Sequence, residues 1–137
     1  DLIMPYRLEM GTKFQNSRGE NLYKFWGTKL SSHLNKELDQ HKRRYIINCA
    51  SVEYFKSLNK SNLKAEIITP IFKEIRLGKA KIISFFAKKA RGMMARYIVQ
   101  NQINNKDQIL NFNLDGYKYS RELSANEYEP VFTREKN

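Results

Sequence analysis

Residues 64–86, KAEIITPIFKEIRLGKAKIISFF, decide the fold class, because they combine two apolar β-rich runs with a short turn between them. Residues 64–75 and 79–86 each favour a strand, and Arg76-Leu77-Gly78 predicts the hairpin that joins them. Pro70 interrupts the first run and cannot donate a ladder hydrogen bond, so we expect that strand to lie at an edge or to carry a bulge.

The residues that follow, KKARGMMARYIVQNQI at 88–103, change to a helical period. Their apolar stripe consists of Ala90, Met93, Met94, Tyr97, Ile98 and Val99. Gly92 inside this predicted helix costs about 1 kcal/mol relative to Ala. A glycine at such a position predicts that another part of the molecule packs closely against the backbone.

Further elements are predicted on both sides of this segment. Upstream, the pattern predicts a long amphipathic helix over 19–40, a buried strand over 45–50 and a helix over 52–58 with Ser51 as its N-cap. Downstream, a short helix near 105–110 and two weak strands within 117–132 are expected. The predicted fold class is therefore α/β, with a mixed β-sheet flanked by helices.

Composition sets broad limits on this chain of 137 residues. Its length fits one domain, and 41% apolar residues with few Gly and Pro exclude collagen, low-complexity disorder and coiled coil. The longest apolar runs are only a few residues, and no charged-then-apolar leader opens the sequence, so we expect neither a membrane span nor secretion. Cys49 is the single cysteine, which suits a reducing cytoplasm.

The net charge of +11 is unevenly distributed. Residues 42–96 hold fourteen Lys and Arg against three acids, whereas the rest of the chain is neutral. No acid occurs between Glu74 and Asp107. A polarised block of this kind predicts a surface for a polyanion, and the alternative is a solvated face that only maintains solubility.

The densest part of this block lies where the predicted strand passes into the predicted helix. Lys88, Lys89 and Arg91 then fall in the first helical turns, where the helix dipole disfavours cations. A bound phosphate or phosphate backbone would relieve this conflict, and pairing with carboxylates elsewhere would relieve it equally.

Catalytic and metal-binding motifs are weak. His33, Glu37 and His41 share one face at helical spacing, but no second Cys or His cluster completes a site, so we interpret them as a surface stripe. Cys49 within an apolar strand is expected to be inert. No nucleophile elbow, phosphate loop or dinucleotide-binding motif occurs, and the sequence predicts no catalytic residue, no metal site and no cofactor.

Five blocks follow one another along the chain: PYRLEMG (5–11), LYKFWG (22–27), INCASVEYFK (47–56), KIISFFAKKARG (81–92), and FN with GY (112–113 and 116–117). In this order they resemble the YaaA family of bacterial peroxide-stress proteins. The resemblance corresponds to the C-terminal half of the family, so residues 1–137 are expected to form the C-terminal portion of a larger domain whose N-terminal half is absent.

The resemblance implies a cytoplasmic α/β protein that limits hydrogen peroxide damage by lowering unincorporated iron and that binds DNA in a basic cleft. The basic block and the resemblance together predict the DNA- or anion-binding residues, of which Lys88, Lys89 and Arg91 match family positions, and Lys81 and Arg96 belong to the basic block. The implied polar residues of the cleft are Arg7, Glu9, Asn48, Ser51, Glu53 and Tyr54. Cys49 and Phe86 depart from the family pattern, where Leu and Tyr are common.

A second hypothesis stays open beside DNA binding. The polar groups of the motif blocks are more varied than phosphate binding requires, and they would also suit an enzyme that acts on a small anionic substrate. Direct iron sequestration is the weakest reading, because the chain offers few ligands.

Overall fold

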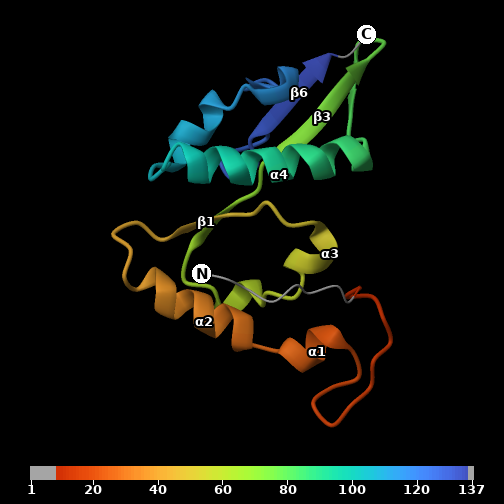
Figure 1. Cartoon of the computed structure of the whole chain (residues 1–137), viewed down its shortest axis with the longest axis vertical. Coiled ribbons are helices and arrows are strands. Elements are labelled where there is room, and N and C mark those ends of the chain that lie inside the picture. The colour runs from red at the N-terminus through yellow and green to blue at the C-terminus, as the bar shows by residue number, and fades with distance from the viewer. Residues whose placement is uncertain (1–8, 136–137) are drawn as a thin grey trace. The chain divides into compact units, whose positions relative to one another are not determined.

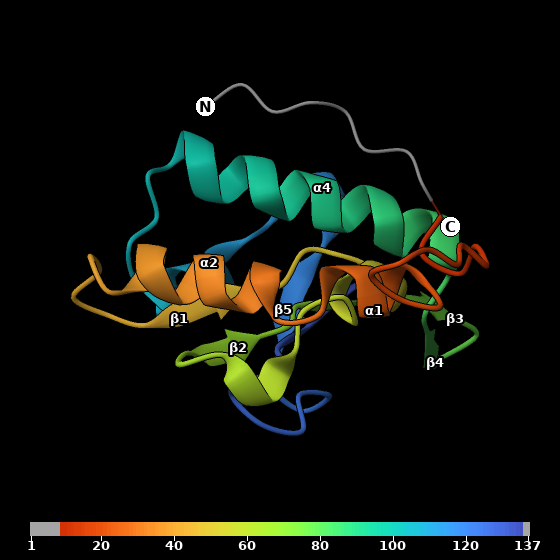
Figure 2. The same cartoon turned by 90° about the horizontal axis from the view of Figure 1, so that it is seen from below.

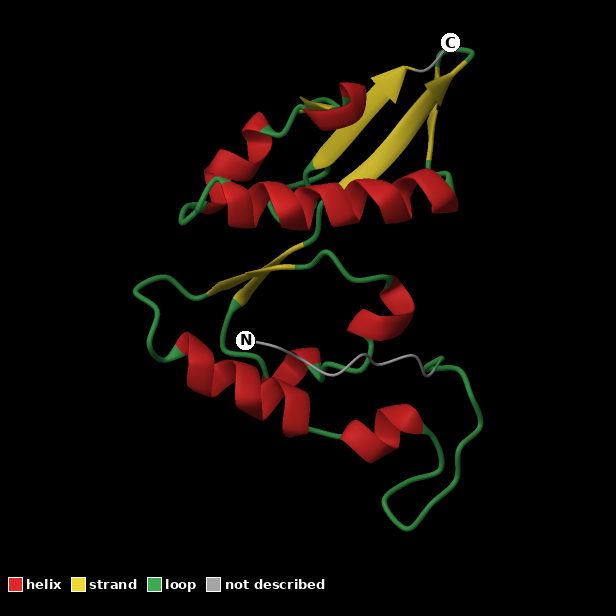
Figure 3. Ribbon diagram, in the orientation of Figure 1, coloured by secondary structure: helices red, strands yellow, loops and turns green. Residues whose placement is uncertain are grey.

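The computed structural model describes residues 9–135, which form two compact units. The first, here called the helical unit, comprises 9–42 and 50–64, and the second, here called the sheet unit, comprises 43–49 and 65–135. Every named strand belongs to the sheet unit, and Figure 3 shows the strands in yellow. The predicted α/β class with mixed strands and flanking helices is confirmed.

The helical unit contains three α-helices and one 3-10 helix, which are α1 (Leu22–Trp26), α2 (Lys29–Leu38), α3 (Val52–Phe55) and η1 (Lys60–Asn62). The single helix predicted over 19–40 is therefore wrong. Gly27 adopts φ 51°, a left-handed conformation that ends α1 and redirects the chain before α2 begins. The side chain of Asn21 accepts a hydrogen bond from the Lys24 N–H and fixes the start of α1.

Ser51 is the N-cap of α3, as predicted. Its Oγ accepts a hydrogen bond from the Tyr54 N–H at 3.4 Å. The helix ends at Phe55 rather than at the predicted residue 58.

Strands of the sheet unit form two separate sheets. β1 (Tyr45–Ile47) pairs in parallel with β2 (Glu66–Ile68). The larger sheet contains β3 (Ile71–Arg76), β4 (Lys79–Lys81), β5 (Lys118–Ser120) and β6 (Val131–Glu135) in the order β4-β3-β6-β5. It is mixed, because β3 and β6 are parallel whereas the outer strands pair antiparallel.

Pro70 divides the strand predicted over 64–75 into β2 and β3, which join different sheets. The expectation of an edge strand is confirmed for β2, which has a partner only on one side, and is wrong for β3, which lies between β4 and β6. The hairpin prediction is confirmed. Leu77 and Gly78 both have positive φ, the conformation that a two-residue hairpin turn requires.

The helix α4 (Ser84–Gln100) is continuous and runs beside β3 and β6 (Figures 1 and 2). Its start lies four residues before the predicted one, so Phe85 and Phe86 are helical and the strand before them ends at Lys81. A short apolar run does not distinguish a strand from a buried helix by period alone. Two 3-10 helices, η2 (Lys106–Asn111) and η3 (Leu114–Gly116), then lead to β5.

The core of the sheet unit lies between α4, η2 and the larger sheet. Its aromatic centre is Phe72, which stacks on its register partner Phe132 with ring centroids 5.4 Å apart. The buried members of this core are Ile68, Phe72, Ala87, Ala90, Met94, Ile109, Phe112, Tyr117 and Phe132. α4 thus buries one face and leaves the opposite face for other contacts.

Candidate functional site

The exposed face of α4 carries most of the predicted anion-binding residues. An α-helix turns by about 100° per residue, so Lys89 and Arg96 lie on one side of the outward face, with Arg91 on the other and Lys88 between them. Lys88, Lys89 and Arg96 are exposed, whereas Arg91 is half-buried. The structure therefore brings these four cations onto one surface, here called the α4 basic face.

The proposed conflict with the helix dipole is weaker than the sequence indicated. Because α4 begins at Ser84, Lys88 is its fifth residue, and the dipole effect decays within the first turn. The prediction that these cations crowd the helix start is therefore wrong.

Gly92 lies at the centre of the α4 basic face. The expectation that another segment packs against it is wrong for the described residues, since a Cβ built there would meet no atom within 4 Å. Phe85 and Val99, each about two turns away on the same face, are 74% and 75% exposed. The centre of the face is thus a shallow backbone surface with cations on its flanks.

Within residues 9–135, Lys89 differs from the other cations of this face by having a carboxylate partner. Its Nζ lies 3.3 Å from Oδ2 of Asp115, and the same carboxylate accepts a hydrogen bond from Nη1 of Arg134. No carboxylate pairs with Lys88, Arg91 or Arg96 among the residues that the structure describes. Three of the four cations are therefore available to an external anion.

Beneath Asp115 lies a buried charge network on the central strands. Nε of Arg134 is 2.9 Å from both carboxylate oxygens of Glu74, and the Tyr117 hydroxyl donates to Glu74 at 2.5 Å. The Arg134 guanidinium also lies 4.5 Å from the ring centroid of Tyr117 and 4.9 Å from that of Phe86. These contacts hold a buried cation between a carboxylate and two aromatic rings.

The network changes the acidity of its members. Burial, and then the hydrogen bond to Glu74, raise the pKa of the Tyr117 phenol above its ordinary value. Burial opposes ionisation of Asp115, but hydrogen bonds from Arg134 and Lys89 outweigh it and hold the pKa of this carboxyl below its ordinary value. Asp115 is thus a carboxylate that two cations keep ionised.

The remaining predicted binding residue of the sheet unit, Lys81, lies at the end of the edge strand β4 and is exposed. It faces Glu74 in the ladder register of β3 and β4. Lys81 therefore belongs to a strand, whereas the other four cations belong to α4.

The predicted polar residues of the cleft are divided between the two units. Asn48, in the sheet unit, is buried, and its Nδ2 donates to Oγ1 of Thr69 at 3.3 Å. In the helical unit, Ser51 is a helix cap, and Oε1 of Glu53 accepts a hydrogen bond from the Gly11 N–H at 3.2 Å. These three side chains hold local structure together.

Glu9 and Tyr54 are exposed members of the helical unit, and Arg7 lies outside the described residues. The basic cleft that these positions were expected to line remains a prediction. The same holds for the alternative of an enzyme with a polar pocket.

Burial raises the pKa of the Cys49 thiol, and the nearby charge of Arg91 opposes this effect. Cys49 is half-buried and packs against the core of the sheet unit. A protonated thiol in such a place is a poor nucleophile, in agreement with the inert reading. Among residues 9–135, no group of three His, Cys, Asp or Glu side chains is arranged to hold a metal ion.

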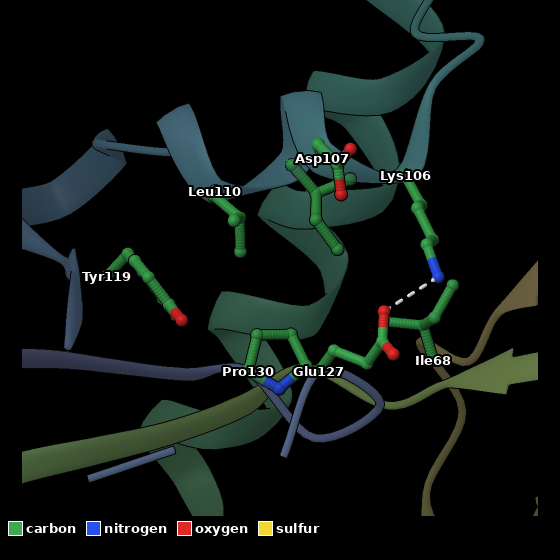
Figure 4. A pocket seen from close by; sticks show the side chains of 8 residues that line it. Ile68, Lys106, Asp107, Leu110, Tyr119, Glu127 and Pro130 are labelled. Carbon is green, nitrogen blue, oxygen red and sulfur yellow. Dashed lines mark hydrogen bonds and ion pairs between the residues drawn. The ribbon is translucent and has the colours of Figure 1, made fainter. Parts of the chain in front are cut away.

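One small cavity of the sheet unit lies beside η2 (Figure 4). Its volume of about 60 Å³ is near that of two water molecules, which is too small for a metabolite. Lys106 stands at its edge and pairs with Glu127 at 3.0 Å and Glu66 at 2.9 Å. Hydrogen bonds to these two carboxylates raise the pKa of Lys106, so its charge is already balanced.

Sequence reasoning missed the members of the buried network, which are Glu74, Asp115, Tyr117 and Arg134. Glu74 stands at an alternating position of a strand and resembles a solvent-facing residue, and Arg134 lies sixty residues later. The only local signal was the block that contains Gly116 and Tyr117.

Comparison with known proteins defines the class to which this fold and its basic helix belong. A sequence model described as "Peroxide stress protein YaaA" matches residues 1–123. The chain belongs to the YaaA family of peroxide stress proteins.

Relatives in several bacteria carry the name UPF0246 protein. One from Pseudoalteromonas translucida is 52% identical over 98% of this chain, and one from Shewanella putrefaciens is 53% identical over the same share. One from Colwellia psychrerythraea is 53% identical over the whole chain. The chain spans about half the length of these relatives, namely 52% of the first two and 53% of the third.

Within the described part of the chain, no helix is both long and apolar enough to cross a membrane.

Proposed function

We propose that this chain contributes to protection against hydrogen peroxide in the cytoplasm and that it binds the phosphate backbone of DNA through the α4 basic face, with Lys81 beside it. Membership of a peroxide-stress family supports the first part. The observation that carries the second is that Lys88, Arg91 and Arg96 flank the open backbone at Gly92 without carboxylate partners among the described residues.

A polyanion explains this arrangement better than solubility alone does. Lysines on a purely solvated face need no uncovered glycine between them, and a glycine in mid-helix costs about 1 kcal/mol. Without a side chain at Gly92, a phosphate backbone can approach the helix more closely and reach cations on both sides. Protein bound along DNA would shield the DNA from oxidative damage. A lower level of unincorporated iron would reduce this damage further.

The binding test is a titration of labelled duplex with the 137-residue chain at several salt concentrations. Lys88→Glu with Arg96→Glu is the most informative variant, because both residues are exposed and the Lys89–Asp115 pair stays intact. We expect duplex affinity to fall at least tenfold and the slope of log K against log salt to decrease by about 2. A matched control, Lys13→Glu with Lys36→Glu, makes the same charge change in the helical unit.

Equal loss in the variant and the control would show that total charge, rather than this surface, drives binding. A flat salt response of the parent chain would contradict phosphate binding altogether. Circular dichroism of all three proteins controls for folding.

The protective role is tested in bacteria that lack their own family member and express this chain. We expect better survival of peroxide and a smaller pool of unincorporated iron, measured by electron paramagnetic resonance. Equal protection by the Lys88→Glu, Arg96→Glu variant at equal expression would separate the stress role from DNA binding.

A further inference from the structure

The helical unit contains a concave surface that carries its own cluster of cations. An open groove of about 430 Å³, here called the lysine groove, lies between α1, the start of α2 and the segment from α3 to η1. Three lysines line it together with Tyr23, Gly27, Thr28, Ser57, Leu58 and Asn59. The lysines are Lys24, Lys56 and Lys60. A volume of this size suits a small-molecule ligand.

Among the residues that the structure describes, no acid lines this groove. Within residues 9–135, none of its lysines pairs with a carboxylate, although the helical unit has several acids of its own. In the sheet unit, Lys89, Lys106 and Arg134 have carboxylate partners, whereas the other cations of the α4 basic face do not among the described residues. The lysine groove therefore concentrates positive charge that the described protein does not balance.

Aromatic rings hold two of these lysines in place. Nζ of Lys56 lies 5.2 Å from the ring centroid of Tyr23, and Nζ of Lys60 lies 5.1 Å from that of Phe55. The Tyr23 ring is itself fixed, since its hydroxyl donates to the carbonyl oxygen of Glu53 at 3.1 Å. A cation–π contact restricts an ammonium group while leaving its net charge intact, whereas a carboxylate would cancel that charge.

The third lysine has a backbone neighbour at its Cβ rather than an aromatic ring at its ammonium group. The backbone of Gly19 lies so close to it that a Cβ at Gly19 would be 2.5 Å from the Cβ of Lys24. Neutral donors complete the wall, namely the hydroxyl of Thr28 and the side-chain amide of Asn59, whereas the Ser57 hydroxyl already donates to the Tyr54 carbonyl oxygen at 2.6 Å. Thr28 makes no capping hydrogen bond to α2 with its side chain, so its hydroxyl is free for another partner.

We propose that the lysine groove is a binding site for the phosphoryl groups of a small molecule, a phosphomonoester or a diphosphate, and that it is separate from the α4 basic face. Several charges gathered on a concave surface match a compact dianion, and the aromatic contacts of Lys56 and Lys60 reduce the entropy lost when these two side chains are ordered on binding. The hydroxyl and amide donors can then form hydrogen bonds with the phosphoryl oxygen atoms. This site does not depend on DNA binding by α4.

The test uses inorganic pyrophosphate as the probe and isothermal titration calorimetry of the 137-residue chain at constant ionic strength. We expect one site per chain, and at least tenfold weaker binding in the variant Lys56→Gln with Lys60→Gln. The matched control, Lys13→Gln with Lys36→Gln, removes the same charge outside the groove and should change affinity less than twofold. Absence of binding, or equal losses in both variants, would overturn the proposal.

A second measurement locates the probe without any substitution. In ¹H–¹⁵N spectra, pyrophosphate should shift the amide signals of Gly27, Thr28 and Ser57 more than that of Gly92. The largest shifts on α4 would overturn the assignment.

Competition separates the two possible sources of phosphate. Saturating pyrophosphate should leave the affinity for labelled duplex unchanged at matched ionic strength. Displacement of the duplex would show that the groove is part of a nucleic-acid surface, and would overturn a separate small-molecule site. Failure of duplex binding itself would count against the α4 basic face and would leave the pyrophosphate result unaffected.

Discussion

Glu74 and Arg134 face each other across the parallel strands β3 and β6, and Nε of Arg134 lies 2.9 Å from both oxygens of the Glu74 carboxylate. Their side chains are 3% and 2% exposed. Two opposite charges at the centre of a four-stranded sheet must satisfy each other, because water is excluded there. This pair links the buried sheet to Asp115 and, through it, to Lys89 on α4.

Arg134→Met should destabilise the chain by about 3–5 kcal/mol, because it leaves the Glu74 carboxylate buried and unpaired. Urea unfolding followed by circular dichroism measures the change. The double variant Glu74→Leu with Arg134→Met should recover much of the loss, since neither charge then remains. A loss below about 1 kcal/mol for Arg134→Met would contradict the network.

Tyr117→Phe should reduce the free energy of unfolding by about 1.5–3 kcal/mol, because it removes a hydrogen bond to a charged acceptor and keeps the ring. The folded-state pKa of Tyr117 is raised, so its contribution is present below the ordinary phenol pKa and is lost as the pH rises above it. The variant should therefore lose less stability than the parent above about pH 10. Tyr119→Phe is the control, and an equal alkaline loss in both variants would contradict the assignment.

Asp115→Asn should change how the free energy of unfolding depends on pH in acidic solution. The folded-state pKa of Asp115 is lowered, so its contribution is present above the ordinary carboxyl pKa and is lost as the pH falls through the folded value. Unfolding free energies between about pH 2 and pH 6 should fall less steeply in the variant than in the parent. Asp107→Asn, an exposed substitution in the same unit, should leave the slope unchanged.

Gly92→Ala should raise the free energy of unfolding by about 0.5–1 kcal/mol, because the new methyl group meets no neighbour and alanine favours a helix. The same change should weaken duplex binding if phosphates approach the backbone there. Ala95→Gly provides the mirror control, with a stability loss of similar size. A Gly92→Ala variant that is less stable than the parent would show that an unseen contact occupies the site.

Gly27→Ala should destabilise the helical unit by 1 kcal/mol or more, because φ 51° is unfavourable for a residue with a Cβ. Thermal unfolding measures the loss, and Gly11→Ala is the control at a glycine without positive φ. An unchanged unfolding temperature for Gly27→Ala would show that the chain between α1 and α2 does not require the positive φ of Gly27.

The sequence by itself determined the fold class, the hairpin of β3 and β4, the Ser51 cap and the presence of an amphipathic helix that carries Lys88 to Arg96. These features depend on hydrophobic period, turn residues and capping hydrogen bonds, which act between near neighbours. The family was also visible in the ordered blocks.

Only the tertiary structure decided where β2 ends and β3 begins, and that α4 starts at Ser84. It also decided that, among residues 9–135, Lys89 has a carboxylate partner and Lys88 has none. It also decided which lysines meet at a groove, since Lys24 and Lys56 are distant in sequence. The physical reason is that an ion pair or a cation–π contact depends on a distance of a few ångströms between two side chains. The number of residues between them along the chain does not determine that distance.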